Sequence, residues 1–250
     1  MFNFPINLDP LQLAGYAVTA LLIGLSKTGV PGIGALIVPS MANIFPSRAS
    51  TGILLPLLIA ADVIAIIIYK KDALWPILLR MFPWTLVGII FGWITLSRIS
   101  DKQLRIVIGI IILVTVITGF IWNFFINKKK TMLLPNFFLP VASISAGFTT
   151  MLANAAGPVV TIFLVSINLN KRQFVGTSAW FYFVINLIKV PFSVQLGLIS
   201  KSSLILNLIA LPAILIGGLL GILILKKIPE TVFSYGVQIL ALLAAINLFL

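Results

Sequence analysis

Residues 24–34 read GLSKTGVPGIG, and this stretch decides how the rest of the chain is interpreted. It places a lysine, two hydroxyl side chains, a proline and four glycines inside an otherwise apolar region. The apolar segments on either side, residues 11–25 and 33–45, are each shorter than the roughly 20 residues with which a helix spans a bilayer. Each flanking segment therefore has the length of an incomplete membrane helix.

A helix break inside a membrane has a chemical consequence, because hydrocarbon offers no hydrogen-bond partners to the freed backbone groups. Such a break is tolerated only inside protein or beside a water-filled cavity. Pro31 suits the first position of a new helix, with Thr28 or Gly29 capping the turn before it. The N-terminus of that helix would bring partial positive charge next to the full charge of Lys27. The stretch therefore predicts an anion-binding pocket.

The composition is that of a multi-span membrane protein. Hydrophobic residues make up 60% of the 250 residues and charged residues only 9%, whereas soluble domains carry roughly 25%. The net charge of +12 comes mostly from Lys and Arg in short loops between apolar segments, where such residues orient membrane proteins and contact anionic headgroups. We therefore expect lipid and a small anionic substrate as partners, and no nucleic acid. The composition leaves a homodimer open.

The chain has no cysteine and no histidine. This excludes disulfides, thiolate nucleophiles, histidine metal sites and histidine general bases. An enzyme embedded in the membrane would need a positioned acid, base, nucleophile or metal ligand, and the apolar segments offer a single acid. We expect no enzyme activity, no catalytic residue, no metal and no cofactor.

The apolar segments predict an all-α polytopic membrane protein with two homologous halves. Each half is a broken helix or hairpin followed by three transmembrane helices. The first half, residues 1–127, contains the broken segment and its spans at residues 11–45, 51–69, 75–96 and 104–126. A basic linker, residues 128–136, leads to the second half, residues 137–250, with its broken segment and spans at residues 137–168, 174–190, 204–225 and 231–250.

The two halves match in sequence as well as in hydropathy. With Gly24 set against Gly147, Gly34 falls on Gly157 and Arg48 on Lys171. One residue of slippage then pairs Gly52 with Gly176 and Asp62 with Asn186. Later in the two halves, Pro83, Gly88, Gly92 and Asp101 fall in the same order on Pro212, Gly217, Gly221 and Glu230. This order is typical of a duplicated unit.

The orientation of the halves depends on the broken segments. If each is a hairpin, each half makes three crossings and the halves are inverted; a single broken span per half would give parallel repeats. The inverted arrangement gathers basic residues of the loops at residues 70–71, 128–130, 171–172 and 226–227 on one side, and Arg48, Arg98, Lys102, Arg105 and Lys201 on the other. The positive-inside rule then places the first group in the cytoplasm and both termini outside.

The second break, LANAAGP at residues 152–158, repeats the features of the first. Pro158 stands at a helix start, and Asn154 could be a cap or a ligand. Thr149 and Thr150 could donate to an anion or satisfy backbone freed by the break. Corresponding broken segments in two halves indicate a transporter binding site. The predicted substrate contacts are therefore Lys27, Thr28, Gly29, Pro31, Gly32, Thr149, Thr150, Asn154, Gly157 and Pro158.

Other charged and aromatic side chains keep more than one interpretation. Asp62 lies deep in its apolar segment, where a charge costs about 2.5 to 3.5 kcal/mol, and it could pair with Lys27, carry a coupled proton or bind a cation. Lys27 itself could contact substrate, pair structurally or snorkel to the interface. Topology determinants or an anion funnel are the alternatives for Arg48, Lys171 and Arg172. We expect Lys189 to snorkel, with pore lining as the alternative. We expect Trp180 and Tyr182 to pack or to lie at the interface, with a place in the substrate wall as the alternative.

The sequence from Gly24 onward resembles the TauE/SafE family of sulfite and organosulfonate exporters, and the resemblance covers nearly the whole chain. The resemblance rests on the lysine-glycine-proline-glycine break, followed by Pro39, Arg48, Asp62 and Trp75, and on a degenerate second copy at residues 147–158. It implies a multi-pass permease of a bacterial or archaeal inner membrane. The implied cargo is sulfite, sulfoacetate or a related sulfonate, moved outward and driven by the proton gradient. With no histidine present, Asp62 would be the proton site.

Three rival functions remain at the level of sequence. The substrate could be another small anion, such as a carboxylate. A cation or neutral-solute carrier would use Asp62 as its ligand instead of Lys27. A non-transporting subunit would show no flux in vesicles.

Overall fold

A computed structural model describes residues 8–30, 33–104, 106–107, 110, 137–167 and 169–229. Within these residues the regular structure is helical, without β-strands, which confirms the all-α class. The helices of the first half are α1 (Pro10–Thr28), α2 (Gly34–Ile44), α3 (Ser47–Tyr69) and α4 (Trp75–Arg98). Those of the second half are α6 (Phe138–Ala153), α7 (Gly157–Ser166), α8 (Lys171–Gln195) and α9 (Lys201–Lys227).

Helices α3, α4, α8 and α9 are long and apolar enough to cross a membrane. They coincide with the predicted spans 51–69, 75–96, 174–190 and 204–225 and extend beyond them. The extensions have a local cause, since capping boxes at Asn170 and Ser200 start α8 and α9 in polar residues ahead of the apolar run. Most of the predicted spans 104–126 and 231–250, and the linker 128–136, lie outside the described residues.

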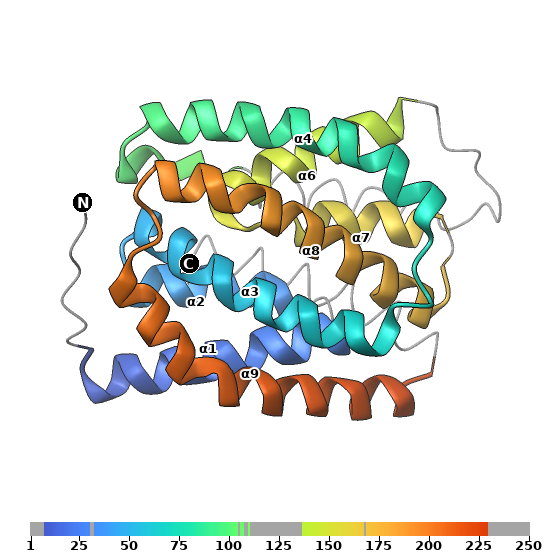
Figure 1. The fold of residues 1–250 in the computed structure, drawn as a ribbon, viewed down its shortest axis with the longest axis horizontal. Coiled ribbons are helices and arrows are strands. Elements are labelled where there is room, and N and C mark those ends of the chain that lie inside the picture. Colours follow the sequence, from blue (N-terminus) through green and yellow to red (C-terminus); the bar gives the residue numbers. More distant parts are fainter. Residues whose placement is uncertain are drawn as a thin grey trace.

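Both broken segments are helical hairpins. In the first, Gly15 near the start of α1 approaches Ile44 at the end of α2, while Ser26 near the end of α1 lies beside Gly34 at the start of α2. In the second, the ring of Phe138 at the start of α6 stacks on Phe163 of α7, with centroids 6.1 Å apart. These contacts require the two helices of each segment to run antiparallel, as Figure 1 shows.

The first break lies later in the chain than the sequence indicated. Helix α1 continues through Lys27 to Thr28, where Gly29 is its C-cap, and α2 begins at Gly34. The prediction that Thr28 or Gly29 would cap the second helix is therefore wrong, because Thr28 ends α1 and Gly29 is its C-cap. Pro31, the predicted first residue of the second helix, lies outside the described residues. The Thr28 hydroxyl donates to the carbonyls of Gly24 and Gly218, which keeps this turn helical and docks it on α9.

The two halves interlock through reciprocal helix pairs. Helix α1 packs along α9, and its counterpart α6 packs along α4. A Cβ at Gly24 would lie 2.1 Å from the carbonyl oxygen of Ile214, and a Cβ at the corresponding Gly147 would lie 2.1 Å from that of Thr85. Both positions need glycine because backbone meets backbone there. The α1–α9 and α6–α4 contacts are therefore equivalent, with a glycine of one helix facing a backbone carbonyl of the other in both.

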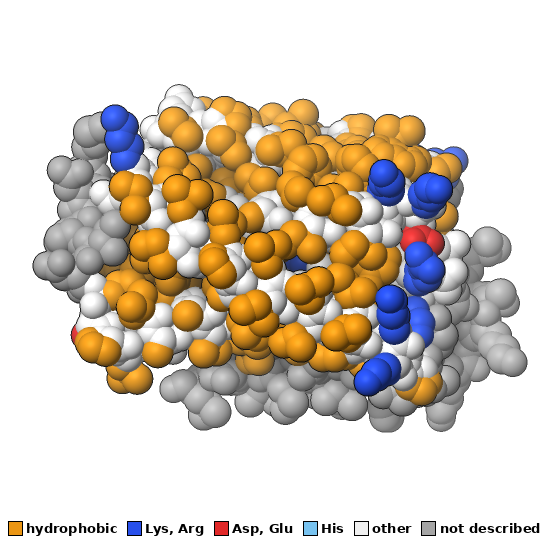
Figure 2. All heavy atoms as spheres, turned by 60° about the horizontal axis from the view of Figure 1, so that its bottom comes forward, with side chains coloured by type: hydrophobic (Ala, Val, Ile, Leu, Met, Phe, Trp, Pro, Cys, Tyr) orange, Lys and Arg blue, Asp and Glu red, His pale blue; other side chains and the backbone are white. Residues whose placement is uncertain are grey.

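Helices α3 and α8 form the centre of the structure (Figure 1). Helices α6, α8 and α9 run in the direction opposite to their counterparts α1, α3 and α4 (Figure 1). Figure 2 shows apolar side chains over the middle of one face and Lys and Arg side chains gathered at one end. An apolar middle with a basic end is the surface expected of a protein that lies in a bilayer.

Candidate functional site

A cavity of about 70 Å³ lies between the two hairpins. The first residues of α2 and α7, Gly34 and Gly157, both line it, together with Lys27 from α1 and Asn154 from the second break. Helices α3 and α8 supply the remaining wall. A water molecule needs about 10–15 Å³ of such space, so the cavity has room for several waters or for a small multi-atom ion. The two breaks therefore contribute to one shared site.

Lys27 and Asp62 form the charged centre of this site. The Lys27 Nζ lies 2.8 Å from the Asp62 Oδ1, and the Asn186 Nδ2 donates to the Asp62 Oδ2 at 2.8 Å. The Tyr182 ring covers the same ammonium, with its centroid 3.9 Å from Nζ. The Asp62 side chain has no exposed surface and that of Lys27 has 11%, so Lys27 does not snorkel. An ammonium has three donors, which leaves Lys27 able to donate into the cavity that it lines.

The expectation that Lys189 snorkels to the interface is wrong. This side chain is 1% exposed, and its Nζ donates to Thr150 Oγ1 at 3.0 Å, to Asn186 Oδ1 at 3.3 Å and to Asn154 Oδ1. Pro191 does not end the helix, because α8 continues to Gln195 and keeps Lys189 inside the protein. Proline is tolerated in membrane helices when neighbouring groups satisfy the freed backbone.

Sequence reasoning left Asn186 out of the site and considered Tyr182 as a substrate wall only as the alternative to packing. Tyr182, Asn186 and Lys189 follow one another at the i, i+4, i+7 spacing of a single helix face. That spacing is visible in the sequence and could have indicated a polar face directed into the protein. Asn186 is also the counterpart of Asp62, and the hydrogen bond between them joins the two halves at equivalent positions.

Only some of the predicted contact residues reach the cavity. Lys27, Thr150, Asn154 and Gly157 line it. Asn154 ends α6 in the left-handed conformation, with φ of 56°, and is therefore the C-cap of α6.

Three of the other predicted contacts, Thr28, Gly29 and Thr149, lie elsewhere. Thr28 and Gly29 face α9, and the Thr149 hydroxyl donates to the Ala146 carbonyl within α6. Pro158 lies in the first turn of α7, as predicted. Pro31 and Gly32 fall outside the described residues.

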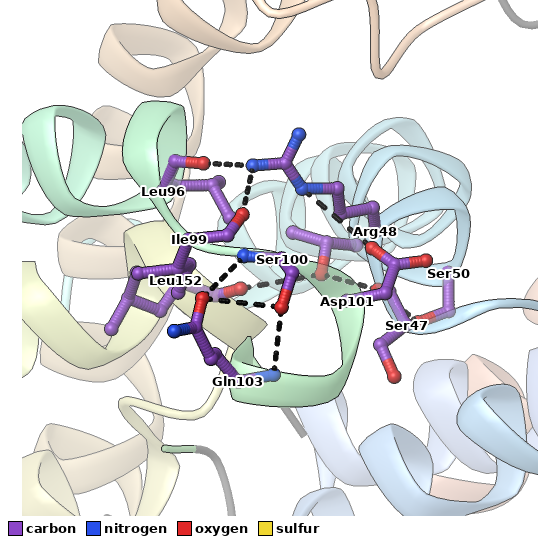
Figure 3. Close-up of polar contacts among 10 residues, drawn as sticks. Ser47, Arg48, Ser50, Leu96, Ile99, Ser100, Asp101, Gln103 and Leu152 are labelled. Atoms are coloured by element: carbon purple, nitrogen blue, oxygen red, sulfur yellow. Dashed lines mark hydrogen bonds and ion pairs between the residues drawn. The ribbon is translucent and has the colours of Figure 1, made fainter. Parts of the chain in front are cut away.

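The three cations of the suggested anion funnel hold helix ends. The Arg48 guanidinium donates to the carbonyls of Leu96 and Ile99 at the end of α4, and its Nε lies 3.6 Å from Asp101 (Figure 3). Lys171 donates to the Ile228 carbonyl after α9 at 2.8 Å, which is the equivalent contact in the second half. Arg172 pairs with Asp72 at 3.2 Å. This geometry favours a structural role for these residues over an anion funnel.

The described part of the chain holds no group of three or more His, Cys, Asp or Glu side chains that could bind a metal ion. The site is instead a small cavity with the Lys27 ammonium, hydroxyl and amide side chains and two helix N-termini at its wall. A comparison with protein families matches residues 16–248 to the family described as sulfite exporter TauE/SafE. The chain belongs to this family. Neither a curated protein nor a solved structure matches it.

Membership in TauE/SafE agrees with the apolar spans and identifies the chain as a multi-pass membrane transporter. The match covers both halves, including both hairpins and the helices that line the cavity. The family match confirms the resemblance found in the sequence, which likewise covers nearly the whole chain.

Proposed function

We propose that this TauE/SafE protein carries small sulfur-containing anions, such as sulfite, sulfoacetate or another organosulfonate, out across a bacterial or archaeal inner membrane. The observation that carries the proposal is the position of Lys27, which lines a cavity shared by both hairpins and lies 2.8 Å from the buried Asp62 carboxylate. A buried ammonium beside a cavity is suited to an anion, and the family description supplies the sulfur chemistry.

Several groups could replace the hydration shell of such an anion. Lys27 offers a charged donor, and Ser26, Thr161 and Ser178 bring hydroxyl groups to the same wall. The starts of α2 and α7 add the partial positive charge of helix N-termini. Apolar side chains of Ile37, Leu54, Leu58 and Val175 form the rest of the lining and could contact the organic part of a sulfonate.

Asp62 would couple anion transport to a proton, because the anion and Asp62 compete for the same ammonium. An anion that takes Lys27 leaves the fully buried Asp62 carboxylate without its counter-ion, and such a carboxylate binds a proton. Binding of the anion and of the proton then favour each other, and by linkage the effect is reciprocal. The two would cross together, so outward flux would follow the anion's own gradient and be opposed by an acidic exterior. This coupling differs from the export driven by the proton gradient that the family resemblance implies.

Alternating access would come from one half rocking against the other around the fixed cavity. The α3–α8 contact, with the Asp62–Asn186 hydrogen bond at 2.8 Å, lies between the halves and next to the cavity. If the repeats are inverted, the two halves can exchange conformations. The inward-open and outward-open states would then be related by the pseudo-two-fold axis of the repeats. The opposite directions of the corresponding helices support this arrangement.

Flux measurements in proteoliposomes test the proposal. Sulfite, thiosulfate, methanesulfonate and acetate would be followed in both directions, each with and without an imposed pH gradient. We expect flux of the sulfur anions that responds to the gradient and is lost in Lys27→Ala. A carboxylate carrier would instead prefer acetate. Flux that persists in Lys27→Ala but is lost in Asp62→Asn would favour a cation or neutral-solute carrier and refute the proposal.

A further inference from the structure

The second half brings its own buried ammonium to the shared cavity. In the alignment of the two halves Lys27 falls on Thr150, and Asp62 falls on Asn186. The Lys189 Nζ donates to Thr150 Oγ1 at 3.0 Å and to Asn186 Oδ1 at 3.3 Å, and this side chain is 1% exposed. A second ammonium therefore lies beside the two residues that correspond to the Lys27–Asp62 pair.

Lys189 is held behind the cavity wall. Its three acceptors, on Thr150, Asn154 and Asn186, are neutral, and all three residues line the cavity, whereas Lys189 does not. Three acceptors use all three N–H groups of an ammonium. Among the residues that the structure describes, no acidic side chain forms an ion pair with Lys189. Lys189 can therefore act on a ligand through its charge, while Lys27 provides the direct contact.

Lys189 is not placed to replace Lys27 as the counter-ion of Asp62. Asn186 lies between the two, because its amide donates to Asp62 Oδ2 at 2.8 Å and its carbonyl oxygen accepts from Lys189. An anion that takes Lys27 therefore removes the one ammonium in contact with Asp62 within the described residues, and the buried carboxylate binds a proton. The loaded site then holds two ammonium groups and a neutral acid.

We propose that the site is built for doubly charged anions, with Lys27 as the contacting cation and Lys189 as the second charge. The inference rests on the proposed proton-coupled anion transport and adds the charge class of the cargo. In a low-dielectric cavity a dianion balances both ammonium groups, whereas a monoanion leaves one buried positive charge and binds more weakly. Sulfoacetate and fully ionised sulfite are dianions. Lys189 is a positioning residue, since it acts without touching the substrate.

The charge class also fixes how transport responds to voltage. A dianion that crosses with one proton carries one net negative charge, so the membrane potential, which is negative inside, would help to expel it. A monoanion that crosses with one proton carries no net charge. The electrical part of the proton gradient would then drive export of a dianion even though an acidic exterior opposes it.

Calorimetry on the purified full-length chain tests the role of Lys189 with sulfate, a dianion, and methanesulfonate, a monoanion of similar shape. The interaction energy of two charges is proportional to each charge, so Lys189→Gln should weaken methanesulfonate binding about tenfold and sulfate binding about a hundredfold. A purely structural role would weaken both by the same factor. Lys189→Arg keeps the charge and should leave the ratio of the two affinities unchanged. The control Lys226→Gln removes an exposed cation at the end of α9 and should change neither affinity.

Asp62→Asn checks the protonation state in the loaded site. Asparagine stands in for the protonated acid, so this variant should keep the ratio of sulfate to methanesulfonate affinity of the unaltered protein. A ratio that rises tenfold or more in Asp62→Asn would mean that Asp62 stays ionised beside the anion and would overturn the inference. Equal losses for the two probes in Lys189→Gln would also overturn it.

Flux through the unaltered protein in proteoliposomes decides the question if Lys189→Gln fails to fold. The vesicle interior is made positive by a tenfold inward potassium gradient with valinomycin, at equal pH on both sides. One net negative charge per cycle should support an inward sulfate gradient of about tenfold, and methanesulfonate should not accumulate. No sulfate accumulation, or about a hundredfold accumulation without a proton, would overturn the inference. Absence of any anion binding or flux would refute the proposed function instead.

Discussion

At the scale of single residues, Lys27 has two partners on the protein and a third direction open to the cavity. Asp62 and the Tyr182 ring hold its ammonium at 2.8 Å and 3.9 Å, and the cavity lies beside it. An ammonium held in this way is oriented before the ligand arrives, which lowers the cost of binding. It also makes the ligand a competitor of Asp62.

Lys27→Ala should therefore abolish anion binding. Truncating one partner of a buried charge contact costs about 2 kcal/mol or more, which corresponds to a loss of about 30-fold or more in affinity. The variant also leaves Asp62 unpaired, so Lys27→Ala combined with Asp62→Asn is the matched version without a lone buried charge. Titration with methanesulfonate measures both. Binding within a few-fold of the unaltered protein in either variant would remove Lys27 from the site.

Asp62→Asn should bind the anion at least as tightly as the unaltered protein, because Lys27 is no longer shared with a carboxylate. It should no longer take up a proton when the anion binds. Proton uptake is measured with a pH indicator in weakly buffered detergent solution as methanesulfonate is added. The same uptake in Asp62→Asn and in the unaltered protein would place the coupled proton elsewhere.

Residues that are expensive in a membrane could be identified from sequence. Lys27 and Asp62 stand out because a charged side chain in an apolar membrane segment is costly and is retained only when it has a partner or a function. In the structure the two side chains pair directly. Lys189 could not be assigned in the same way, since Pro191 two residues later suggested a helix end and an interface. Its burial depends on acceptors from α6 and the second break, which lie 39 and 35 residues away along the chain, respectively.

At the scale of elements, the reciprocal packing of α1 on α9 and α6 on α4 depends on glycines that let backbones touch. A Cβ added at Gly24 or Gly147 would lie 2.1 Å from a carbonyl oxygen of the facing helix. Backbone atoms cannot give way as a side-chain end can, so the helices would have to separate along the contact. The two contacts are equivalent by the sequence repeat.

Gly24→Ala and Gly147→Ala should therefore destabilise the protein by similar amounts, about 1 to 3 kcal/mol each. Gly157→Ala is the matched control, since a Cβ there meets no atom within 4 Å. The unfolding temperature in detergent, followed by tryptophan fluorescence, measures the effect. Equal unfolding temperatures for all three variants would contradict the close packing of both pairs.

The type and order of helices followed from hydropathy, whereas several helix ends did not. Asn170 and Ser200 start α8 and α9 through capping boxes in polar residues that the apolar runs do not include. Helix α1 extends to Thr28 because the Thr28 hydroxyl finds an acceptor on α9, the Gly218 carbonyl. A contact 190 residues away in the chain cannot be inferred from local sequence signals.

At the scale of the whole molecule, the repeat in sequence becomes a repeat in contacts. Arg48 holds the Ile99 carbonyl after α4, and Lys171 holds the Ile228 carbonyl after α9. Glycines and prolines at matching intervals could reveal the duplication because they sit where helices break or touch. The relative direction of the halves could not be read in the same way, since it depends on whether each broken segment crosses the membrane or returns.

Hairpins in both halves favour inverted repeats, which labelling can test. The chain has no cysteine, so single substitutions give clean probes. Lys70→Cys, after α3, should react with a membrane-impermeant maleimide only from the cytoplasm, and Lys201→Cys, at the start of α9, only from outside. Both lysines are exposed, so substitution should not disturb folding. Reaction of both cysteines from the same side would contradict the inverted arrangement.

The central claim is that an anion sits between the two hairpins in contact with Lys27. Selenite is a close chemical analogue of sulfite and scatters X-rays anomalously, so a crystal of the full-length protein soaked with selenite locates the ion directly. The account predicts an anomalous peak inside the cavity, within hydrogen-bonding distance of the Lys27 Nζ and close to Asn154. A peak only among the basic residues at the helix ends, with none in the cavity, would contradict it.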